Sequence, residues 1–144
     1  MYVDSSLLAR AYLADEPGHD DAETMLADPH LGLITGTWTR VEVSEALVRA
    51  ARAGRGDERG LLSLLDADLS EDGSVAVITA PQDDIEDHAL HLVRKYAIRA
   101  MDARHLAVAV LVAPSLVEPG EEVGFATRDE AQSSVARTLG LQTV

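Results

Sequence analysis

Hydrophobic and polar positions follow two different periods along this chain. Short apolar runs bounded by turn residues predict β-strands at residues 1–4, 31–36, 74–79, 123–127 and 141–144. Longer segments, in which apolar residues recur every three or four positions, predict helices at residues 5–15, 18–29, 37–54, 57–72, 81–97, 101–113 and 128–140. Strands that alternate with helices predict an α/β fold, a three-layer α/β/α sandwich with a mainly parallel central sheet.

The predicted helix at residues 101–113 differs from the others because it is apolar on nearly every side. We expect such a helix to be central and buried. Residues 114–122, PSLVEPGEE, follow it and are predicted to form a loop. The chain shows no repeat, linker or low-complexity tract, so we expect residues 1–144 to form a single domain.

The composition narrows the class of protein. Hydrophobic residues make up 47% of the 144 positions, which is enough for an ordinary core. No apolar run approaches the ~18 residues that a membrane-spanning helix needs, and the N-terminus lacks the pattern of a signal peptide. The absence of cysteine excludes disulfides, thiolate metal sites and thiol nucleophiles. We therefore expect a cytoplasmic protein without membrane contact.

The net charge is −13, from 25 acidic and 12 basic residues. Taken alone, this balance opposes binding to nucleic acids, which attract basic surfaces, and favours cations or basic partners. The alternative is an acidic surface that only keeps the protein in solution. The positions of individual carboxylates are needed to choose between these interpretations.

Three aspartates lie where predicted helices begin. Asp4 follows the first strand, Asp129 follows the fourth strand, and Asp102 opens the apolar helix. In parallel α/β sheets, ligands bind beyond the carboxyl ends of the strands, at such junctions. Aspartate is also a favoured N-cap, so each of the three has an alternative role in helix capping.

The neighbouring residues bear on these alternatives. Thr127 and Glu130 have the spacing of a capping box, and if Thr127 caps the last helix, Asp129 is not needed for that role. Asp102 lies at the edge of the predicted core, where an unpaired charge is costly. Two arginines close to it in sequence offer the competing explanation of an ion pair.

Glu42 is a fourth candidate. Glu45 and Arg49 form an i, i+4 pair on the same predicted helix, so Glu45 is assigned to a surface salt bridge. Glu42 has no cation at the same spacing. Its alternative role is a capping box with Thr39.

Four carboxylates that met in one place would repel one another and would not all stay ionised. A divalent cation resolves the repulsion, and an all-oxygen ligand set without cysteine suits Mg²⁺ or Mn²⁺. These ions activate water and stabilise charge on a phosphoryl group. If Asp4, Glu42, Asp102 and Asp129 converge, the reaction class is metal-assisted phosphodiester hydrolysis.

Four stretches of the chain resemble a known family. They are MYVDSSLLARAYL, RVEVSEALVRA, AMDARHLAVAV and GFATRDEAQSSVARTLGLQTV, in this order from end to end. Together they resemble the PIN-domain ribonucleases, and among these the VapC-type toxins of bacterial toxin–antitoxin pairs. The resemblance implies a PIN-like fold, Mg²⁺- or Mn²⁺-dependent endoribonuclease activity, inhibition by a cognate antitoxin protein, and homodimerisation.

The resemblance also assigns roles to residues. It carries the family's acidic set, both catalytic and metal-binding, onto Asp4, Glu42, Asp102 and Asp129. It matches Ser6 and Thr127 to hydroxyl residues that support the metal site. Two bound divalent ions would offset only about four of the negative charges, so the binding of RNA would depend on the metal and on a local group of arginines. The candidate RNA-binding residues are Arg10, Arg40, Arg104 and Arg128.

Two other classes of protein compete with a ribonuclease. One is a Mg²⁺-binding signalling module, but receiver domains need a lysine at a late strand end, and Lys95, the only lysine, falls in a predicted helix. A related Mg²⁺-dependent protein, a phosphatase of the haloacid-dehalogenase type, is opposed in the same way, because it would need an aspartate where this chain has Ser6. The other class is a non-catalytic scaffold with a PIN-like fold, which binds a partner through its acidic face and gains little stability from Mn²⁺.

The histidines are assigned structural roles. His88 and His91 have a spacing that can bind zinc, but no third ligand is evident, so a position on a helix surface is the simpler interpretation. We expect His105, three residues after Asp102, to pack near the site rather than to act as a base. The apolar edges of the helices at 5–15 and 57–72 predict a groove that would accept a helix of an antitoxin.

Overall fold

The computed structural model describes residues 1–118, 121 and 123–144. Within these residues a five-stranded sheet has the order β3-β2-β1-β4-β5, and its strand pairs are all parallel. The strands are β1 (Tyr2–Val3), β2 (Leu33–Gly36), β3 (Val75–Ile78), β4 (Gly124–Ala126) and β5 (Gln142–Thr143). The predicted α/β fold with a mainly parallel sheet is confirmed.

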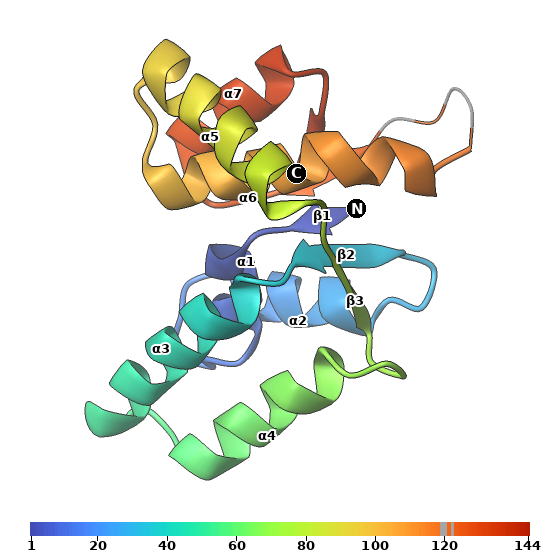
Figure 1. Cartoon of the computed structure of the whole chain (residues 1–144). Helices are drawn as coiled ribbons and strands as arrows, with labels where there is room; N and C mark the ends of the chain where they lie inside the picture. The colour runs from blue at the N-terminus through green and yellow to red at the C-terminus, as the bar shows by residue number, and fades with distance from the viewer. Residues whose placement is uncertain (119–120, 122) are drawn as a thin grey trace.

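Helices cover both faces of the sheet. They are α1 (Ser5–Ala11), α2 (His19–Ala27), α3 (Thr39–Arg52), α4 (Glu58–Asp68), α5 (Gln82–Tyr96), α6 (Ala100–Val112) and α7 (Glu130–Thr138), with a 3₁₀ helix η1 (Ala113–Leu116) after α6. None of the helices in the described part of the chain is both long enough and apolar enough to cross a membrane. In Figure 1, α1 to α4 lie below the sheet and α5 to α7 lie above it, so the molecule has the three predicted layers.

Each face of the sheet has its own hydrophobic core, and β1 contributes to both because successive residues of a strand point to opposite faces. Tyr2 packs with the core of the upper layer, and its ring stacks on that of Phe125 in β4 with 5.2 Å between the centroids. Val3 packs on the other face, in the core that includes Val43 of α3 and Leu65 of α4. The two cores therefore meet at β1, in the middle of the sheet.

The central helix of the upper layer is α6, as its apolar sequence predicts. Its buried residues are Ala103, His105, Leu106, Ala107, Val108 and Ala109. His105 is the polar exception, and only 3% of its surface is exposed. A buried imidazole needs hydrogen-bond partners, and those partners lie in the candidate site described below.

The stretch predicted as a loop after α6 is partly helical, so the prediction was wrong for residues 114–116. These residues belong to η1, where Pro114 lies in the first turn and its missing N–H costs no hydrogen bond. Residues 119, 120 and 122 of the same predicted loop lie outside the described residues. At the other end, Gly140 follows the C-cap of α7 with φ +85°, a conformation that favours glycine.

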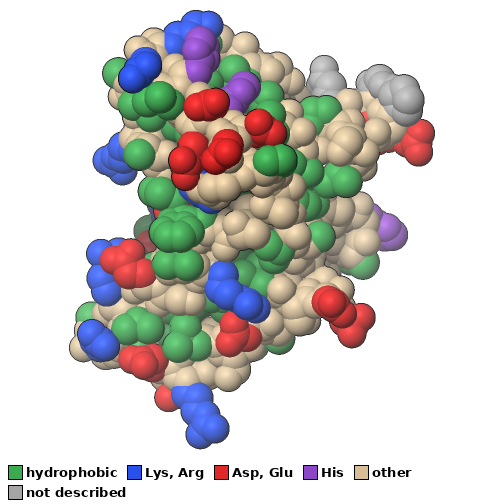
Figure 2. All heavy atoms as spheres, in the orientation of Figure 1, with side chains coloured by type: hydrophobic (Ala, Val, Ile, Leu, Met, Phe, Trp, Pro, Cys, Tyr) green, Lys and Arg blue, Asp and Glu red, His purple; other side chains and the backbone are tan. Residues whose placement is uncertain are grey.

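Charge is distributed unevenly over the face shown in Figure 2. Acidic side chains gather over α5, whose exposed residues include Asp83, Asp84, Glu86 and Asp87. Over α3 and α4, basic and acidic side chains are interspersed. The net charge of −13 therefore does not describe each surface of the molecule, and a basic region is compatible with it.

Candidate metal centre

The carboxyl ends of β1 and β4 lie side by side in the middle of the sheet. From β1 the chain adds β2 and β3 on one side of the sheet and then β4 and β5 on the other. The direction in which strands are added therefore reverses between β1 and β4. In α/β proteins, ligands bind at such a switch point. The register pairs Val3 with Ala126, and the N–H of Asp4 donates to the carbonyl of Ala126 at 3.1 Å. Asp4 and Thr127 therefore leave neighbouring strands at the same edge of the sheet.

Asp4 is buried, and hydrogen bonds hold both of its carboxylate oxygens. Its Oδ1 caps α1 by accepting from the N–H groups of Ser6 and Leu7, both at 3.1 Å, and it also accepts from the Ser6 hydroxyl at 2.8 Å. Its Oδ2 accepts from the Thr127 hydroxyl at 3.2 Å. Burial raises the pKa of the Asp4 carboxyl, while His105 and these hydrogen bonds oppose the rise. Because capping uses Oδ1, the helix cap leaves Oδ2 with capacity for another ligand.

Asp129 caps α7, so of the two alternatives that the sequence left open, capping by Asp129 is the one that the structure shows. Its Oδ1 accepts from the N–H of Gln132 at 2.9 Å, whereas Thr127 Oγ1 accepts from the N–H of Asp129 at 3.1 Å. The reason is the position of the helix start. Glu130 is the first residue of α7 and not the third, so the capping-box spacing does not apply.

Glu42 does not form the capping box with Thr39 that was its alternative role. Thr39 is itself the first residue of α3, and its hydroxyl lies 2.7 Å from the Thr35 hydroxyl inside the sheet. Glu42 Oε2 instead lies 2.7 Å from Nε2 of His105, which comes from α6 on the other side of the sheet. The side chain of Glu42 therefore reaches the region at the end of β1.

His105 connects Glu42 to β1. Its Nδ1 lies 2.9 Å from the hydroxyl of Tyr2, and this hydroxyl accepts from the N–H of Gly36 at 3.1 Å. The proton of the Tyr2 hydroxyl is then available to Nδ1, which leaves Nε2 as the N–H that donates to Glu42. Sequence reasoning placed His105 near the site but missed this chain of bonds. Its signal was a single histidine in an otherwise apolar helix, three residues after Asp102.

Asp102 lies in the first turn of α6, whose N-cap is Arg99. Burial, repulsion from Asp129 and repulsion from Asp4 raise the pKa of the Asp102 carboxyl, and the charge of Arg99 opposes the rise. In the part of the chain that the structure describes, no ion pair joins Asp102 to Arg99 or Arg104. Asp102 is thus close enough to Asp4 and Asp129 to be repelled by both, and Arg99 offsets that repulsion only in part.

Gln132 is a residue of this region that sequence reasoning missed. It is fully buried, its amide donates to the backbone carbonyl of Asp102 at 3.3 Å, and its Oε1 lies within hydrogen-bond distance of the Thr127 hydroxyl. Gln132 therefore holds the first turn of α6 against the end of β4. A glutamine in an amphipathic helix is normally a surface residue, so its sequence context carried no signal.

The donor chemistry of this cluster fits a hard divalent cation. Asp4, Glu42, Asp102 and Asp129 offer carboxylate oxygens, and a cation would relieve the repulsion that raises the pKa of Asp102. Their arrangement is not a complete ligand set. Among residues 1–118, 121 and 123–144, no three Asp, Glu or His side chains lie together as a group that could hold a metal ion. Binding of a cation would therefore bring these carboxylates closer together than they lie in this structure.

Comparison with known proteins identifies the family of this fold. The PIN domain family matches residues 1–137. The chain belongs to the PIN-domain family. PIN domains are generally metal-dependent nucleases, so membership indicates nuclease activity. No curated protein sequence matches this PIN domain.

The four arginines predicted to bind RNA do not form one group in this PIN domain. Arg10 and Arg128 line the same pocket beside α1 and α3. Arg40 pairs with an aspartate of α4 at 3.5 Å, and the guanidinium of Arg104 lies over the ring of Trp38, 5.7 Å from its centroid. Of the four, Arg10 and Arg128 are the pair that shares a cavity, and contact of each arginine with RNA stays a prediction.

Proposed function

We propose that this PIN domain is a metal-dependent endoribonuclease that acts as the toxin of a toxin–antitoxin pair. The observation that carries the proposal is the position of Asp4 and Asp129 after neighbouring strands at the switch point of the sheet, with Asp102 close enough to be repelled by both, in a member of a nuclease family. Carboxylates that repel one another destabilise a fold unless a cation balances them. A protein without a use for the cation would be more stable with one of these charges removed.

In this proposal, Asp4, Glu42, Asp102 and Asp129 hold Mg²⁺ or Mn²⁺ and form the catalytic set. When bound, the ion supplies an activated water and stabilises the charge that develops on the phosphate as an RNA phosphodiester is hydrolysed. The supporting residues act on the carboxylates. Ser6 and Thr127 hold Asp4 by hydrogen bonds, and such contacts reduce the rearrangement that ligand binding requires.

The resemblance to VapC-type toxins supports the remaining parts of the proposal. The substrate is RNA, a cognate antitoxin protein inhibits the enzyme, two copies form a homodimer, and the protein acts in the cytoplasm. Residues 1–144 form one PIN-like domain in this proposal.

A non-catalytic PIN-like scaffold is the second candidate. The observation that favours it is the lack of a complete three-residue ligand group within the described ranges of the chain. The net charge of −13 also opposes RNA binding over most of the surface. A scaffold would bind a partner through its acidic face and would have no need of a divalent ion.

Addition of Mn²⁺ should separate the two candidates. We expect Mn²⁺ at about 100 times its dissociation constant to raise the melting temperature by roughly 5–10 °C, because binding to the folded state adds about 2.7 kcal/mol of stability. The same Mn²⁺ should start cleavage of purified total RNA, and EDTA should stop it. Thermal melts and gel analysis of the RNA measure both effects. A melting temperature unchanged by Mn²⁺, together with intact RNA, would favour the scaffold.

A further inference from the structure

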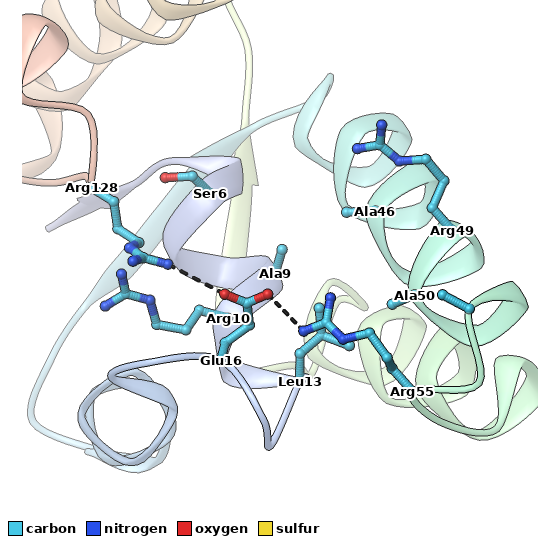
Figure 3. A pocket seen from close by; sticks show the side chains of 11 residues that line it. Ser6, Ala9, Arg10, Leu13, Glu16, Ala46, Arg49, Ala50, Arg55 and Arg128 are labelled. Carbon is cyan, nitrogen blue, oxygen red and sulfur yellow. Dashed lines mark hydrogen bonds and ion pairs between the residues drawn. The ribbon is translucent and has the colours of Figure 1, made fainter.

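A pocket of about 350 Å³ lies beside the candidate metal centre, between α1 and α3. Figure 3 shows Ser6 and Ala9 of α1 on one side and Ala46 and Ala50 of α3 on the other. Ser6 also donates to Asp4 at 2.8 Å, so the pocket adjoins the candidate metal centre. Its volume is at the lower end of the range of small-molecule sites, about 300–1,000 Å³.

The polar lining of this pocket is mainly basic. Arg10, Arg49, Arg55 and Arg128 line it, and Glu16 is the one carboxylate among the described lining residues. Arg49 also pairs with Glu45 at 3.5 Å and Arg55 with Asp15 at 2.7 Å, so four arginines face three carboxylates. In a chain with a net charge of −13, the remaining excess of one positive charge is a small local reversal. A concave basic region attracts anions even when the whole molecule is acidic. We call it the arginine pocket.

Glu16, from the connection between α1 and α2, lies between two of the arginines. Its Oε1 accepts from Nη2 of Arg55 at 2.7 Å, and its Oε2 lies 3.6 Å from Nη1 of Arg128. Figure 3 draws both contacts, with the carboxylate between the two guanidinium groups. Arginine binds carboxylate and phosphate through the same donors, so Glu16 occupies a position that suits an anionic group of a ligand.

Arg10 is less well satisfied than its neighbours. Its Nε is buried and lacks a hydrogen-bond partner among the residues that the structure describes. Over the same residues, no ion pair involves Arg10. The Nε itself is closed to solvent, but Arg10 lines the pocket without a paired carboxylate among the described residues, so its charge is available to a bound anion.

We propose that the arginine pocket binds a phosphate group of the RNA next to the phosphate that is cleaved, and that this phosphate displaces Glu16 from Arg55 and Arg128. The inference rests on the proposed function, which makes RNA the substrate. Every nucleotide carries a phosphate, so an RNA strand bound at Asp4 places another phosphate nearby. Ser6 both lines the arginine pocket and donates to Asp4, so the pocket and the candidate metal centre are neighbours. The apolar lining, which includes Ala9 and Leu13, is suited to packing against a ribose or base.

The test measures RNA binding without catalysis. A fluorescein-labelled single-stranded RNA is titrated in EDTA and followed by fluorescence anisotropy. We expect Arg10→Gln and Arg55→Gln each to weaken binding about tenfold and to reduce the slope of log K against log salt by about 0.7. We expect Glu16→Gln to strengthen binding about fivefold, because the internal competitor loses its charge.

Glu71→Gln is the matched control. It makes the same chemical change in an exposed residue of the connection between α4 and β3. This connection leads into the amino end of β3, whereas the candidate site lies at the carboxyl ends of the strands. Its RNA affinity should stay within about twofold of wild type, since a distant charge is screened by salt. Equal strengthening by Glu71→Gln and Glu16→Gln would mean that only net charge changed, and it would overturn the role of Glu16.

The outcomes separate this inference from the proposed function. Wild-type affinity in both Arg10→Gln and Arg55→Gln, with melting temperatures that show folded protein, overturns the arginine pocket. The inference is also overturned if the two variants weaken the binding of a protein partner while their RNA affinity stays at the wild-type value. Cleavage by wild type in Mn²⁺ alongside such a result would leave the proposed function standing. Wild type that neither binds nor cleaves RNA would contradict the proposed function itself.

Discussion

Replacement of Asp4 by asparagine should lower the rate of RNA cleavage by at least about 100-fold while the fold remains intact. Asparagine keeps a side-chain oxygen that accepts from the N–H groups of Ser6 and Leu7, so the cap of α1 persists. It removes the negative charge that a divalent ion requires. Initial rates on a fluorescent RNA in Mn²⁺ measure the first effect, and circular dichroism measures the second.

The same substitution should stabilise the metal-free protein at neutral pH. Burial raises the pKa of the Asp4 carboxyl above its ordinary value of 3.8, so between the two values the folded state binds more protons than the unfolded state. The contribution of Asp4 to stability is therefore most favourable at low pH and falls as the pH rises through the folded pKa. Asparagine does not titrate. The melting temperature of Asp4→Asn relative to wild type should thus increase from pH 4 to pH 7 in EDTA.

Asp57→Asn is the matched control for this experiment. Asp57 is the N-cap of α4, where its Oδ2 accepts from the N–H of Gly60 at 2.7 Å, and it is exposed. The control makes the same chemical change at a helix cap that is not part of the candidate site. It should leave the rate of cleavage within about twofold of wild type. Full activity in Asp4→Asn would contradict the assignment of Asp4 to the metal centre.

The alternation of strand and helix patterns was sufficient to predict the fold because each element is bounded by its own turn residues. The assignment of side chains to the two cores was not available from that pattern. Tyr2 and Val3 form a two-residue strand that is buried on both faces of the sheet. Neither their polarity nor their spacing shows which of the two packs against which layer of helices. The 3₁₀ turn at Pro114 was missed because proline in a polar stretch usually indicates a loop.

The choice between capping alternatives could not be made from the sequence for a different reason. A capping box depends on the register between the first helical residue and the capping residue, and sequence patterns locate helix starts only to within a few residues. A shift of two positions exchanged the roles of Thr127 and Asp129. The contacts that organise the site are also distant in the chain. Thr127 and Asp4 are 123 positions apart, and His105 and Glu42 are 63 apart, so no local pattern records them.

His105→Ala should lower the free energy of unfolding by about 2–4 kcal/mol. The substitution leaves a cavity in the core around α6 and removes one partner of the Tyr2 hydroxyl and the histidine partner of Glu42. If Glu42 is a metal ligand, loss of its hydrogen bond should also weaken Mn²⁺ binding by about 10–100-fold. Urea denaturation measures the stability, and calorimetric titration of the folded protein measures the affinity for Mn²⁺.

Comparison with His105→Gln separates a positioning role from a purely structural one. The glutamine amide retains an N–H donor for Glu42 but fills less of the core, so this variant should be destabilised and yet bind Mn²⁺ more tightly than His105→Ala. His91→Ala, on the exposed surface of α5, should change neither stability nor affinity appreciably. Equal Mn²⁺ affinity in wild type and in both His105 variants would mean that His105 only fills the core. Glu42 would then bind the ion without help from His105, or would not be a ligand at all.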